Sequence, residues 1–464
     1  MTATLEFLGA TRTVTGSRFL LDVSGHRTLV DCGLYQGAKE LRLRNWEPLP
    51  VAASSIDDVV LTHAHIDHAG YLPRLCRDGF RGAVHVTSAT ADLLPIMLAD
   101  SGHLQEEEAE YHNLRGTSKH HPALPLYTAA DGLKAAARAT GHAYGERVEL
   151  DPVLSLELVP AGHIIGAATV TCEVATAGGR RRVVFSGDLG RYGAPIMPDP
   201  TPIGDADYIV VESTYGDRDH DPTPVADQLA RVLIETAARD GATVIPAFAV
   251  GRTQEIMYHL TELERAGRIP RIPCYIDSPM AMRATDVYRA HRHELDGDMQ
   301  ARSIEGASPL ESRRFRITTS PAESRGIHAI PGPVIIIAGS GMVTGGRVLH
   351  HLRERLPDPR TTVLLVGYQA LGTRGRALAD GAATVRIFGQ EVAVRADVVT
   401  VHGLSAHADR AGLLRWLRTA RRVPRGVSVV HGEPGPASAL AEAIDRELGW
   451  RVSMPNFRDR VSFD

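Results

Sequence analysis

The segment LTHAHIDHAG, residues 61–70, brings four potential metal ligands into six consecutive positions: His63, His65, Asp67 and His68. The preceding run, IDDVVL, predicts a buried strand that ends where these ligands begin. Imidazole and carboxylate groups suit zinc and similar transition metals. Four ligands this close do not fit comfortably around one tetrahedral ion, so the spacing favours two adjacent ions. A polar loop with solvated histidines would be the simpler explanation for a single histidine. It does not explain three histidines and an aspartate directly after an apolar strand.

The size and composition of the chain indicate a globular protein of more than one domain. It has 464 residues, 43% of them hydrophobic and 23% charged, so two domains with sizeable cores are expected. The net charge of −4 excludes a strongly basic coat for nucleic acid. It leaves room for a local basic groove, because net charge does not report how charges are distributed.

Cysteine usage and the absence of long apolar runs predict a cytoplasmic protein. The four cysteines follow no CxxC pattern and are expected to be reduced thiols. The first residues, MTATLEFLGATRTVTGS, do not read as a signal peptide. Because no apolar stretch approaches the length of a bilayer span, we expect no membrane segment.

The order of predicted strands and helices divides the chain into three segments. Residues 1–216 are rich in short strands, with a helix expected over 88–115. Over 217–385, strands and helices alternate, which predicts a separate doubly wound parallel sheet. In 386–464, histidines again follow strands, as they do in the first segment. We therefore predict that the second domain is inserted into the first.

Further polar residues follow predicted strands in the first segment. Asp31 lies in LVDCG, His163 in AGHIIGA and Asp188 in FSGDLG. Together with HxHxDH, these motifs and their order resemble the metallo-β-lactamase fold over nearly the whole chain. The resemblance implies an α/β protein, an αββα sandwich with helices outside and sheets inside.

Three more motifs narrow the resemblance. Glu212 in VVESTYGDR, His407 in GLSAHADR and His431 in VVHGEP resemble the extra motifs of the β-CASP subgroup, whose second domain is the inserted doubly wound segment. Relatives include the endonuclease subunit of the cleavage and polyadenylation specificity factor and ribonuclease J. The compact length is similar to that of the short bacterial and archaeal ribonucleases of the group.

The resemblance implies two zinc ions per chain, for which manganese could substitute. It assigns His63, His65 and His163 to one ion, Asp67, His68 and His431 to the other, and Asp188 to both. It also implies that Asp31 supports and orients these ligands, as metal sites usually require. All seven ligands match their motifs; the nearby Leu404 stands where relatives often have an aromatic residue.

The implied reaction is phosphodiester hydrolysis by a hydroxide activated between the two metal ions. Asp67, His407 and Glu212 form the expected catalytic set. His407 would donate a proton to the leaving 3′-oxygen or stabilise the phosphate directly. Glu212 would hydrogen-bond His407 and favour its protonated form. The plainer reading makes His407 only a polar residue in the first turn of a helix.

One glycine-rich turn and one arginine at the head of a helix are candidates for contacts with RNA phosphates. In IIIAGSGMVTGGRVLHHL, a strand, a turn and a helix would expose backbone N–H groups near Ser340 and Gly341 to an anion. In PAFAVGRTQE, Arg252 stands at the head of a helix and is a candidate phosphate contact. Alternatively, the turn only reverses the chain and Arg252 is an ordinary surface residue.

These observations favour a zinc-dependent ribonuclease that binds single-stranded RNA in a cleft between the two domains. The alternatives are a DNA nuclease of the same superfamily, an RNA-binding scaffold with weak activity, and a small-molecule hydrolase. His431 favours RNA over DNA, because the DNA branch generally lacks this histidine. The sequence does not decide between endonuclease and 5′→3′ exonuclease action, and it does not identify the RNA target or the oligomeric state. Because family members are often dimers, the resemblance suggests a homodimer.

Overall fold

The computed structural model describes residues 2–118, 120–311, 314–367, 369–370 and 372–463. The chain forms two compact units. The first contains Met1–Asp219 and His407–Asp464, and the second contains His220–Ala406. In chain order, the second unit is thus inserted into the first.

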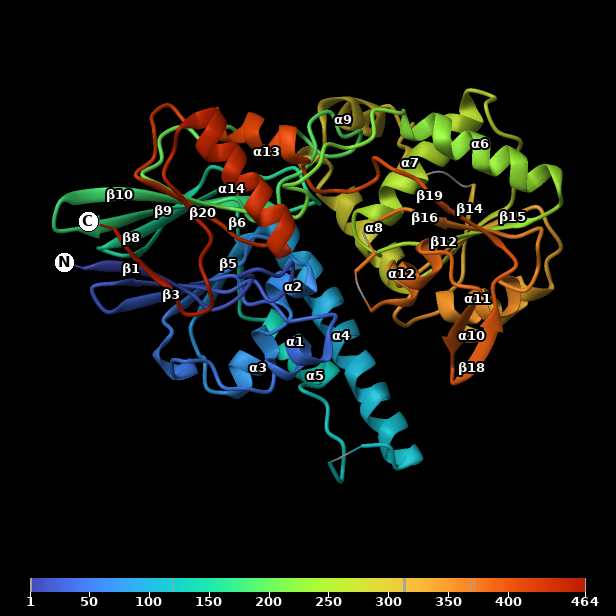
Figure 1. The fold of residues 1–464 in the computed structure, drawn as a ribbon, viewed down its shortest axis with the longest axis horizontal. Helices are drawn as coiled ribbons and strands as arrows, with labels where there is room; N and C mark the ends of the chain where they lie inside the picture. The colour runs from blue at the N-terminus through green and yellow to red at the C-terminus, as the bar shows by residue number, and fades with distance from the viewer. Residues whose placement is uncertain (1, 119, 312–313, 368, 371, 464) are drawn as a thin grey trace. The chain divides into compact units, whose positions relative to one another are not determined.

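Within the described residues, the first unit contains two seven-stranded sheets (Figure 1). The strands of the first sheet are β1 (Ala3–Phe7), β2 (Phe19–Val23), β3 (His26–Val30), β4 (Asp58–Val60), β5 (Ala83–Thr87), β6 (Ala139–His142) and β22 (Arg460–Ser462). Those of the second are β7 (Arg147–Asp151), β8 (Leu154–Pro160), β9 (Ala168–Thr176), β10 (Gly179–Phe185), β11 (Tyr208–Val211), β20 (Gly426–Val429) and β21 (Val452–Ser453). Their orders are β22-β1-β2-β3-β4-β5-β6 and β21-β20-β11-β10-β9-β8-β7.

The two sheets pack face to face on a largely aliphatic core. Inward-facing residues of both sheets form one buried cluster that includes Leu21 and Val170. Phe19 joins the sheets, since its ring stacks on that of Phe185 with the centroids 6.0 Å apart. Removing a buried aromatic ring of this kind typically costs about 3–5 kcal/mol, so these contacts fix the spacing of the sheets.

Helices cover the outer faces of both sheets. On the first sheet lie α1 (Lys39–Leu43), α2 (Ile66–Ala69), α3 (Leu72–Arg77), α4 (Ser88–Arg115) and α5 (Ala129–Ala136), and on the second lie α13 (Arg410–Leu417) and α14 (Pro434–Leu448) (Figure 1). Fully buried Trp416 and Leu440 anchor the last two helices against the second sheet. The layers follow the order helix, sheet, sheet, helix, which confirms the predicted αββα sandwich.

The second unit is built on a six-stranded sheet. Its strands are β12 (Ala242–Pro246), β13 (Cys274–Asp277), β14 (Phe315–Ile317), β15 (Val334–Ala338), β16 (Thr362–Leu365) and β19 (Asp397–Thr400). The order is β14-β13-β15-β12-β16-β19. Every pairing in this order is parallel, and the four central strands β13, β15, β12 and β16 are buried throughout, as is typical of parallel sheets covered on both faces.

Helices lie on both faces of this sheet, which confirms the predicted doubly wound insert. The helices are α6 (Val225–Ala238), α7 (Arg252–Arg265), α8 (Pro279–Ala290), α9 (Gly297–Ile304), α10 (Pro321–Gly326), α11 (Val348–Arg355) and α12 (Arg374–Ala379). Figure 1 shows α6 and α7 on one face and α11 and α12 on the other. Leu352 of α11 and Leu378 of α12 are buried in one core cluster with Val244 of β12.

One predicted domain boundary differs from the structure. The prediction returns the chain to the first domain at residue 386, whereas the second unit continues through Ala406. A hairpin of β17 (Thr384–Ile387) and β18 (Gln390–Ala393) comes first, and β19 then pairs with β16 through Val363 and Val398. The prediction assigned this strand by the histidine that follows it, but that feature does not determine which sheet a strand joins.

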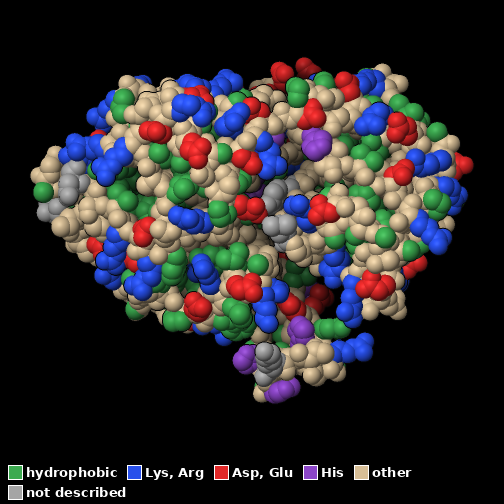
Figure 2. Space-filling model, viewed as in Figure 1, with side chains coloured by type: hydrophobic (Ala, Val, Ile, Leu, Met, Phe, Trp, Pro, Cys, Tyr) green, Lys and Arg blue, Asp and Glu red, His purple; other side chains and the backbone are tan. Residues whose placement is uncertain are grey.

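The surface carries charges of both signs. Figure 2 shows Lys and Arg side chains interspersed with Asp and Glu over the face that it presents, as expected for a net charge of −4. No helix within the described ranges combines the length and apolar character that a bilayer span requires.

Candidate metal centre

The candidate ligands meet because they follow strands whose ends lie at one edge of the sandwich. In the first sheet, β3 and β4 are parallel, and they are followed by Asp31 and by the segment that begins at residue 61. In the second sheet, β10, β11 and β20 are mutually parallel, and Asp188, Glu212 and His431 follow them. Parallel strands end on the same side, so residues far apart in the sequence converge.

The HxHxDH segment changes from loop to helix, and this change separates its four ligands into two pairs. His63 is fully buried in the loop after β4. His65 has extended backbone angles and begins α2, a single turn that carries Asp67 and His68. This change of conformation directs the first two histidines and the last two ligands toward different groups.

His63, His65, His163 and Asp188 form the first ligand group. The Nε2 atom of His63 lies 2.9 Å from Nδ1 of His65, which in turn lies 3.2 Å from Nε2 of His163. The Oδ2 atom of Asp188 lies 3.5 Å from His63 and 3.6 Å from His163. Three imidazoles and one carboxylate oxygen thus surround one point.

Asp67, His68 and His431 form the second group. The Nε2 atoms of His68 and His431 are 3.2 Å apart, and Oδ2 of Asp67 lies 3.7 Å from Nε2 of His431. The other oxygen of Asp188 lies on this side, since Oδ1 is 3.2 Å from Nε2 of His68 and 3.4 Å from the other ring nitrogen of His431, Nδ1. The two oxygens of one carboxylate therefore face two separate groups.

The residues fit a pair of metal ions. Two nitrogen ligands of a tetrahedral zinc ion lie about 3.3 Å apart, given Zn–N bonds of about 2.0–2.1 Å. The nitrogen pairs of both groups, at 2.9–3.2 Å, are close to that separation. A cation placed among the convergent nitrogens and carboxylate oxygen of each group would be bound by all of them at once.

In the first group, the electrostatics favour the protonation states that bind metal, whereas in the second group burial lowers the pKa of His68 but Asp188 and Asp31 outweigh it and raise that pKa. Burial, followed by the neighbouring imidazoles, lowers the pKa of His63 well below its usual value, and burial lowers that of His65 to about 4. Burial raises the pKa of Asp188, but the surrounding histidines outweigh it and hold the pKa well below the usual range. Both histidines are therefore neutral and Asp188 is ionised at neutral pH, the forms in which these groups act as ligands.

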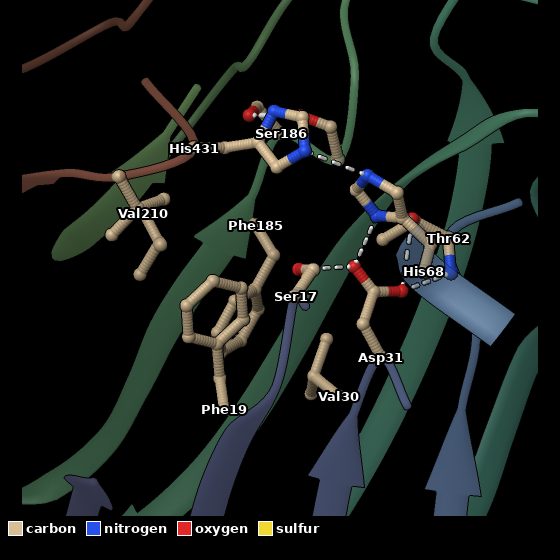
Figure 3. A pocket seen from close by; sticks show the side chains of 12 residues that line it. Ser17, Phe19, Val30, Asp31, Thr62, His68, Phe185, Ser186, Val210 and His431 are labelled. Atoms are coloured by element: carbon tan, nitrogen blue, oxygen red, sulfur yellow. Dashed lines mark hydrogen bonds and ion pairs between the residues drawn. The ribbon is translucent and has the colours of Figure 1, made fainter. Parts of the chain in front are cut away.

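Asp31 holds His68 from the side away from the ligand group (Figure 3). Its Oδ2 lies 2.7 Å from Nδ1 of His68, and Ser17 donates a hydrogen bond to the same oxygen at 2.8 Å. Its Oδ1 accepts hydrogen bonds from the backbone and the hydroxyl group of Thr62, both at 2.9 Å. With Nδ1 of His68 engaged, Nε2 faces Asp188 and His431, and the supporting role of Asp31 stays a prediction.

His407 and Glu212 form a buried pair beside the first group. Nδ1 of His407 lies 3.1 Å from both carboxylate oxygens of fully buried Glu212. Its Nε2 lies 3.9 Å from Oδ2 of Asp188, and 19% of its side chain is exposed. Burial lowers the pKa of His407, but Glu212 and Asp188 outweigh it and raise the pKa to about 9. His407 is thus a protonated imidazole at the edge of the centre.

Several residues that support the centre carry no motif in the sequence. Ser17 and Thr62 hold Asp31, and the backbone N–H of His431 donates to the carbonyl of Ala10 at 2.8 Å. Thr214 lies 3.3 Å from Nδ1 of His431 through its hydroxyl group. Small hydroxyl side chains are common, so only the position of Thr62 beside His63 offered a signal.

The candidate RNA contacts lie in the second unit. The hydroxyl oxygen of Ser340 accepts backbone hydrogen bonds from Thr344 and Gly345, so it closes its own turn. Gly341 packs against the Phe248 ring, which a Cβ atom would meet at 2.7 Å. Arg252 is buried and ion-paired with Glu255, a position that does not suit a direct phosphate contact. All three contacts remain predictions.

Fold and site together define a metal-dependent hydrolase, and comparison with known families agrees. The description "Metallo-beta-lactamase superfamily" matches residues 13–247, just over half of the chain. "Beta-Casp domain" matches residues 253–378, and "Zn-dependent metallo-hydrolase RNA specificity domain" matches residues 391–455. The chain belongs to the metallo-β-lactamase superfamily, in its β-CASP branch.

Curated relatives match over nearly the whole chain. Ribonuclease TTHA0252 of Thermus thermophilus is 38% identical over 454 residues, which cover 98% of each chain. Transcription termination factor FttA of Methanocaldococcus jannaschii is 30% identical over 468 residues, which cover 98% of this chain and 71% of that one. Among solved structures, a protein of unknown function from Enterococcus faecalis V583 shares the fold, with a TM-score of 0.54, 12% identity and full coverage of both chains.

Proposed function

We propose that the protein is a zinc-dependent ribonuclease that hydrolyses phosphodiester bonds of single-stranded RNA. The observation that carries this proposal is the carboxylate of Asp188, whose two oxygens face two separate ligand groups 3.2–3.6 Å away. Two neighbouring metal ions held in this way suit phosphodiester hydrolysis. Support for RNA comes from the "RNA specificity domain" matched by residues 391–455 and from the relative named a ribonuclease.

The donor set indicates which ions the centre would hold. His63, His65 and His163 would bind one ion, Asp67, His68 and His431 would bind the other, and Asp188 would bind both. A set with five imidazoles disfavours magnesium and calcium, and it suits zinc, with manganese as a substitute. When bound, the ions supply Lewis acidity and positive charge that neutralise the phosphate and lower the pKa of water.

His407 would supply the proton that the leaving 3′-oxygen requires. Its raised pKa, about 9, keeps it protonated at neutral pH. Because Nδ1 is held by Glu212, Nε2 is the nitrogen turned toward Asp188 and available to a substrate. Glu212 itself is fixed by the backbone N–H of Leu189 at 2.7 Å, so the pair is preorganised for proton transfer.

The proposal can be tested with RNA labelled separately at its 5′ and 3′ ends, together with a matched single-stranded DNA. We expect zinc-loaded protein to degrade the RNA and a chelator to stop the reaction. The product ladders distinguish internal cleavage from 5′→3′ degradation. His407→Ala should keep its zinc but lose roughly 10²–10⁴-fold in rate, the usual contribution of a general acid. Chelator-insensitive degradation, or no cleavage of RNA by metal-loaded protein, would contradict the proposal.

A further inference from the structure

The segment that joins β1 to β2 is fastened to the second ligand group at both of its ends. At one end, the carbonyl of Ala10 accepts a hydrogen bond from the backbone N–H of His431 at 2.8 Å. At the other, the backbone N–H of Ser17 donates to the carbonyl of Asp67 at 2.8 Å, and its hydroxyl donates to Asp31 at 2.8 Å. The segment is therefore positioned by the residues that make or support this group.

The base of the segment, where Gly9 faces Gly16, is closely packed. A Cβ atom on Gly9 would lie only 1.7 Å from the carbonyl oxygen of Gly16, so the backbone at Gly9 is in direct contact with the backbone at Gly16. A Cβ atom on Gly16 would meet the ring of Tyr35 at 2.6 Å. Because both ends of the segment are hydrogen-bonded and Gly9 packs against Gly16, the residues between them, called the tip below, have little freedom to move away from the centre.

The backbone of the tip is strained. Ala10 and Arg12 have φ angles of 49° and 56°, in the left-handed region that non-glycine residues rarely adopt. Of the nine described non-glycine residues with positive φ, four belong to this part of the molecule: Ala10, Arg12, Asp31 and His431. Such residues cost of order 1–3 kcal/mol each and concentrate at functional sites. The strain therefore points to a function for the tip as well as for the ligands.

Arg12 is the residue that this backbone presents to solvent. Its neighbours Thr11 and Thr13 are buried, whereas Arg12 is exposed. Its guanidinium makes no hydrogen bond or ion pair with any other described residue. Its Cα atom lies at most about 7.6 Å from that of Ala10, since consecutive Cα atoms are about 3.8 Å apart. A cation with no described partner is thus carried by a segment whose ends are hydrogen-bonded to residues that make or support the second ligand group.

We propose that Arg12 is a substrate-binding residue whose guanidinium contacts a phosphate oxygen of the RNA beside the bond that is cleaved. A planar guanidinium binds phosphate through paired hydrogen bonds, and it does so best where the backbone fixes its origin. The strained, anchored backbone provides that origin, and the missing intramolecular partner leaves the charge for a ligand. This inference rests on the proposed ribonuclease function, because it takes the anion to be RNA.

The test compares Arg12→Asn with the wild-type protein. Asparagine tolerates the left-handed conformation, so the change removes the charge without adding backbone strain. For full-length zinc-loaded protein, we expect KM for a single-stranded oligoribonucleotide of mixed sequence to rise about five- to twentyfold, with kcat and zinc content nearly unchanged. In chelator, fluorescence anisotropy with the same labelled RNA should show a weaker Kd and a salt slope reduced by about 0.7, as for one lost phosphate contact on a single strand.

Two further variants separate charge from backbone effects. Arg12→Lys should retain most of the salt slope but lose part of the affinity, because an ammonium group lacks the planar fork of arginine. Arg458→Asn is a matched control, since Arg458 is also exposed and left-handed, with a φ of 71°, but faces Glu6 at 3.6 Å. We expect this control to bind RNA like the wild type.

Two results would overturn the inference. One is a Kd and salt slope of Arg12→Asn equal to those of the wild type, and the other is a loss of zinc, which would make the residue a support for the ligands. Failure of the proposed ribonuclease function would give a different result, because the wild type would then cleave no RNA at all. Weaker RNA binding by Arg12→Asn with no cleavage by the wild type would retain the contact and reject the ribonuclease.

Discussion

The metal centre of the first unit and the Asp277 cluster of the second both gather buried histidine and aspartate side chains, but they are completed differently. Asp277 is fully buried and is bonded to Thr318, to Ser324 at 2.5 Å, and to Arg347 and His351 at 2.6 Å each. Every contact of the carboxylate joins a donor to an acceptor. The Asp277 cluster is complete as a set of protein groups.

The Asp277 cluster contains one pair of facing imidazole nitrogens, Nδ1 of His351 and Nε2 of His328 at 3.2 Å, whereas in the metal centre several such nitrogens converge together with carboxylate oxygens. Nε2 of His68 lies 3.2 Å from Nε2 of His431, and Nε2 of His63 lies 2.9 Å from Nδ1 of His65. Burial alone therefore does not identify a metal site. The distinguishing property is whether the buried polar atoms satisfy one another or converge on a point that a cation would fill.

The largest expected effect follows from Asp188, which both ligand groups share. Asp188→Asn should leave at most one zinc ion per chain and lower the rate of RNA hydrolysis roughly a thousandfold or more, since metal ions contribute several kcal/mol to such reactions. Elemental analysis and single-turnover kinetics measure the two effects. The matched control is Asp78→Asn, because Asp78 pairs with Arg74 at the surface, away from both ligand groups. A variant with two zinc ions and normal rates would show that Asp188 does not join the groups.

Asp277→Ala tests the other side of the comparison. Removing the carboxylate leaves buried His351 without its partner, so we expect a loss of about 3–5 kcal/mol in the free energy of unfolding, with zinc content unchanged. Thr318→Val removes one hydrogen bond and should cost about 1 kcal/mol. Urea denaturation followed by circular dichroism measures both losses. Release of zinc from the folded Asp277→Ala protein would mean that the cluster takes part in metal binding.

Asp31 supports a ligand without belonging to either group. Asp31→Ala should weaken zinc binding about 10–100-fold, the usual effect of removing the partner that orients a metal-bound histidine. A competition titration against a chromogenic chelator measures the change. Asp22→Ala is the control, because Asp22 lies in the same unit and pairs with Arg27 near the surface. Equal zinc affinities in the two variants would argue against the supporting role.

The last predicted effect is a difference in acid sensitivity. The pKa of His65 is lowered from 6.5 to about 4 in the folded protein, so between these values the unfolded chain binds a proton that the folded chain does not. The stability of the metal-free protein should therefore fall as the pH falls from 6.5 to 4, by at most about 1.4 kcal/mol per pH unit from this group. His65→Gln should flatten that slope in urea titrations at several pH values.

The Asp277 cluster should respond only at lower pH. Burial raises the pKa of Asp277, but hydrogen bonds from His351, Ser324 and Thr318 outweigh it and hold the pKa well below its usual value of 3.8. Its contribution to stability is present above that value and is lost as the pH falls below it. An Asp277 variant with a changed slope between pH 5 and 6.5 would contradict this separation.

Much of the candidate centre could be predicted because its ligands have both a distinctive type and a distinctive place. Three histidines and an aspartate within residues 63–68 are rare unless they bind a metal, and Asp188 and His431 also directly follow strands. The αββα sandwich could be predicted for a similar reason, since alternation and apolar runs report which faces are buried.

The remainder depends on contacts that the sequence does not encode locally. Ser17 and Ala10 support the centre only because their segment is folded back onto it. Arg252 looks like a surface residue at the head of a helix, yet Glu255, one turn later, pairs with it inside the unit. The second unit continues beyond the predicted return at 386 because strand pairing, here β19 with β16, is a long-range choice.

The most direct test is a zinc titration of metal-free protein in which bound zinc and RNA hydrolysis are followed together. If the two ligand groups act as one centre through Asp188, we predict two equivalents of tightly bound zinc per chain, with hydrolysis rising mainly as the second equivalent binds. Full hydrolysis after one equivalent, or none after two, would contradict a two-metal ribonuclease.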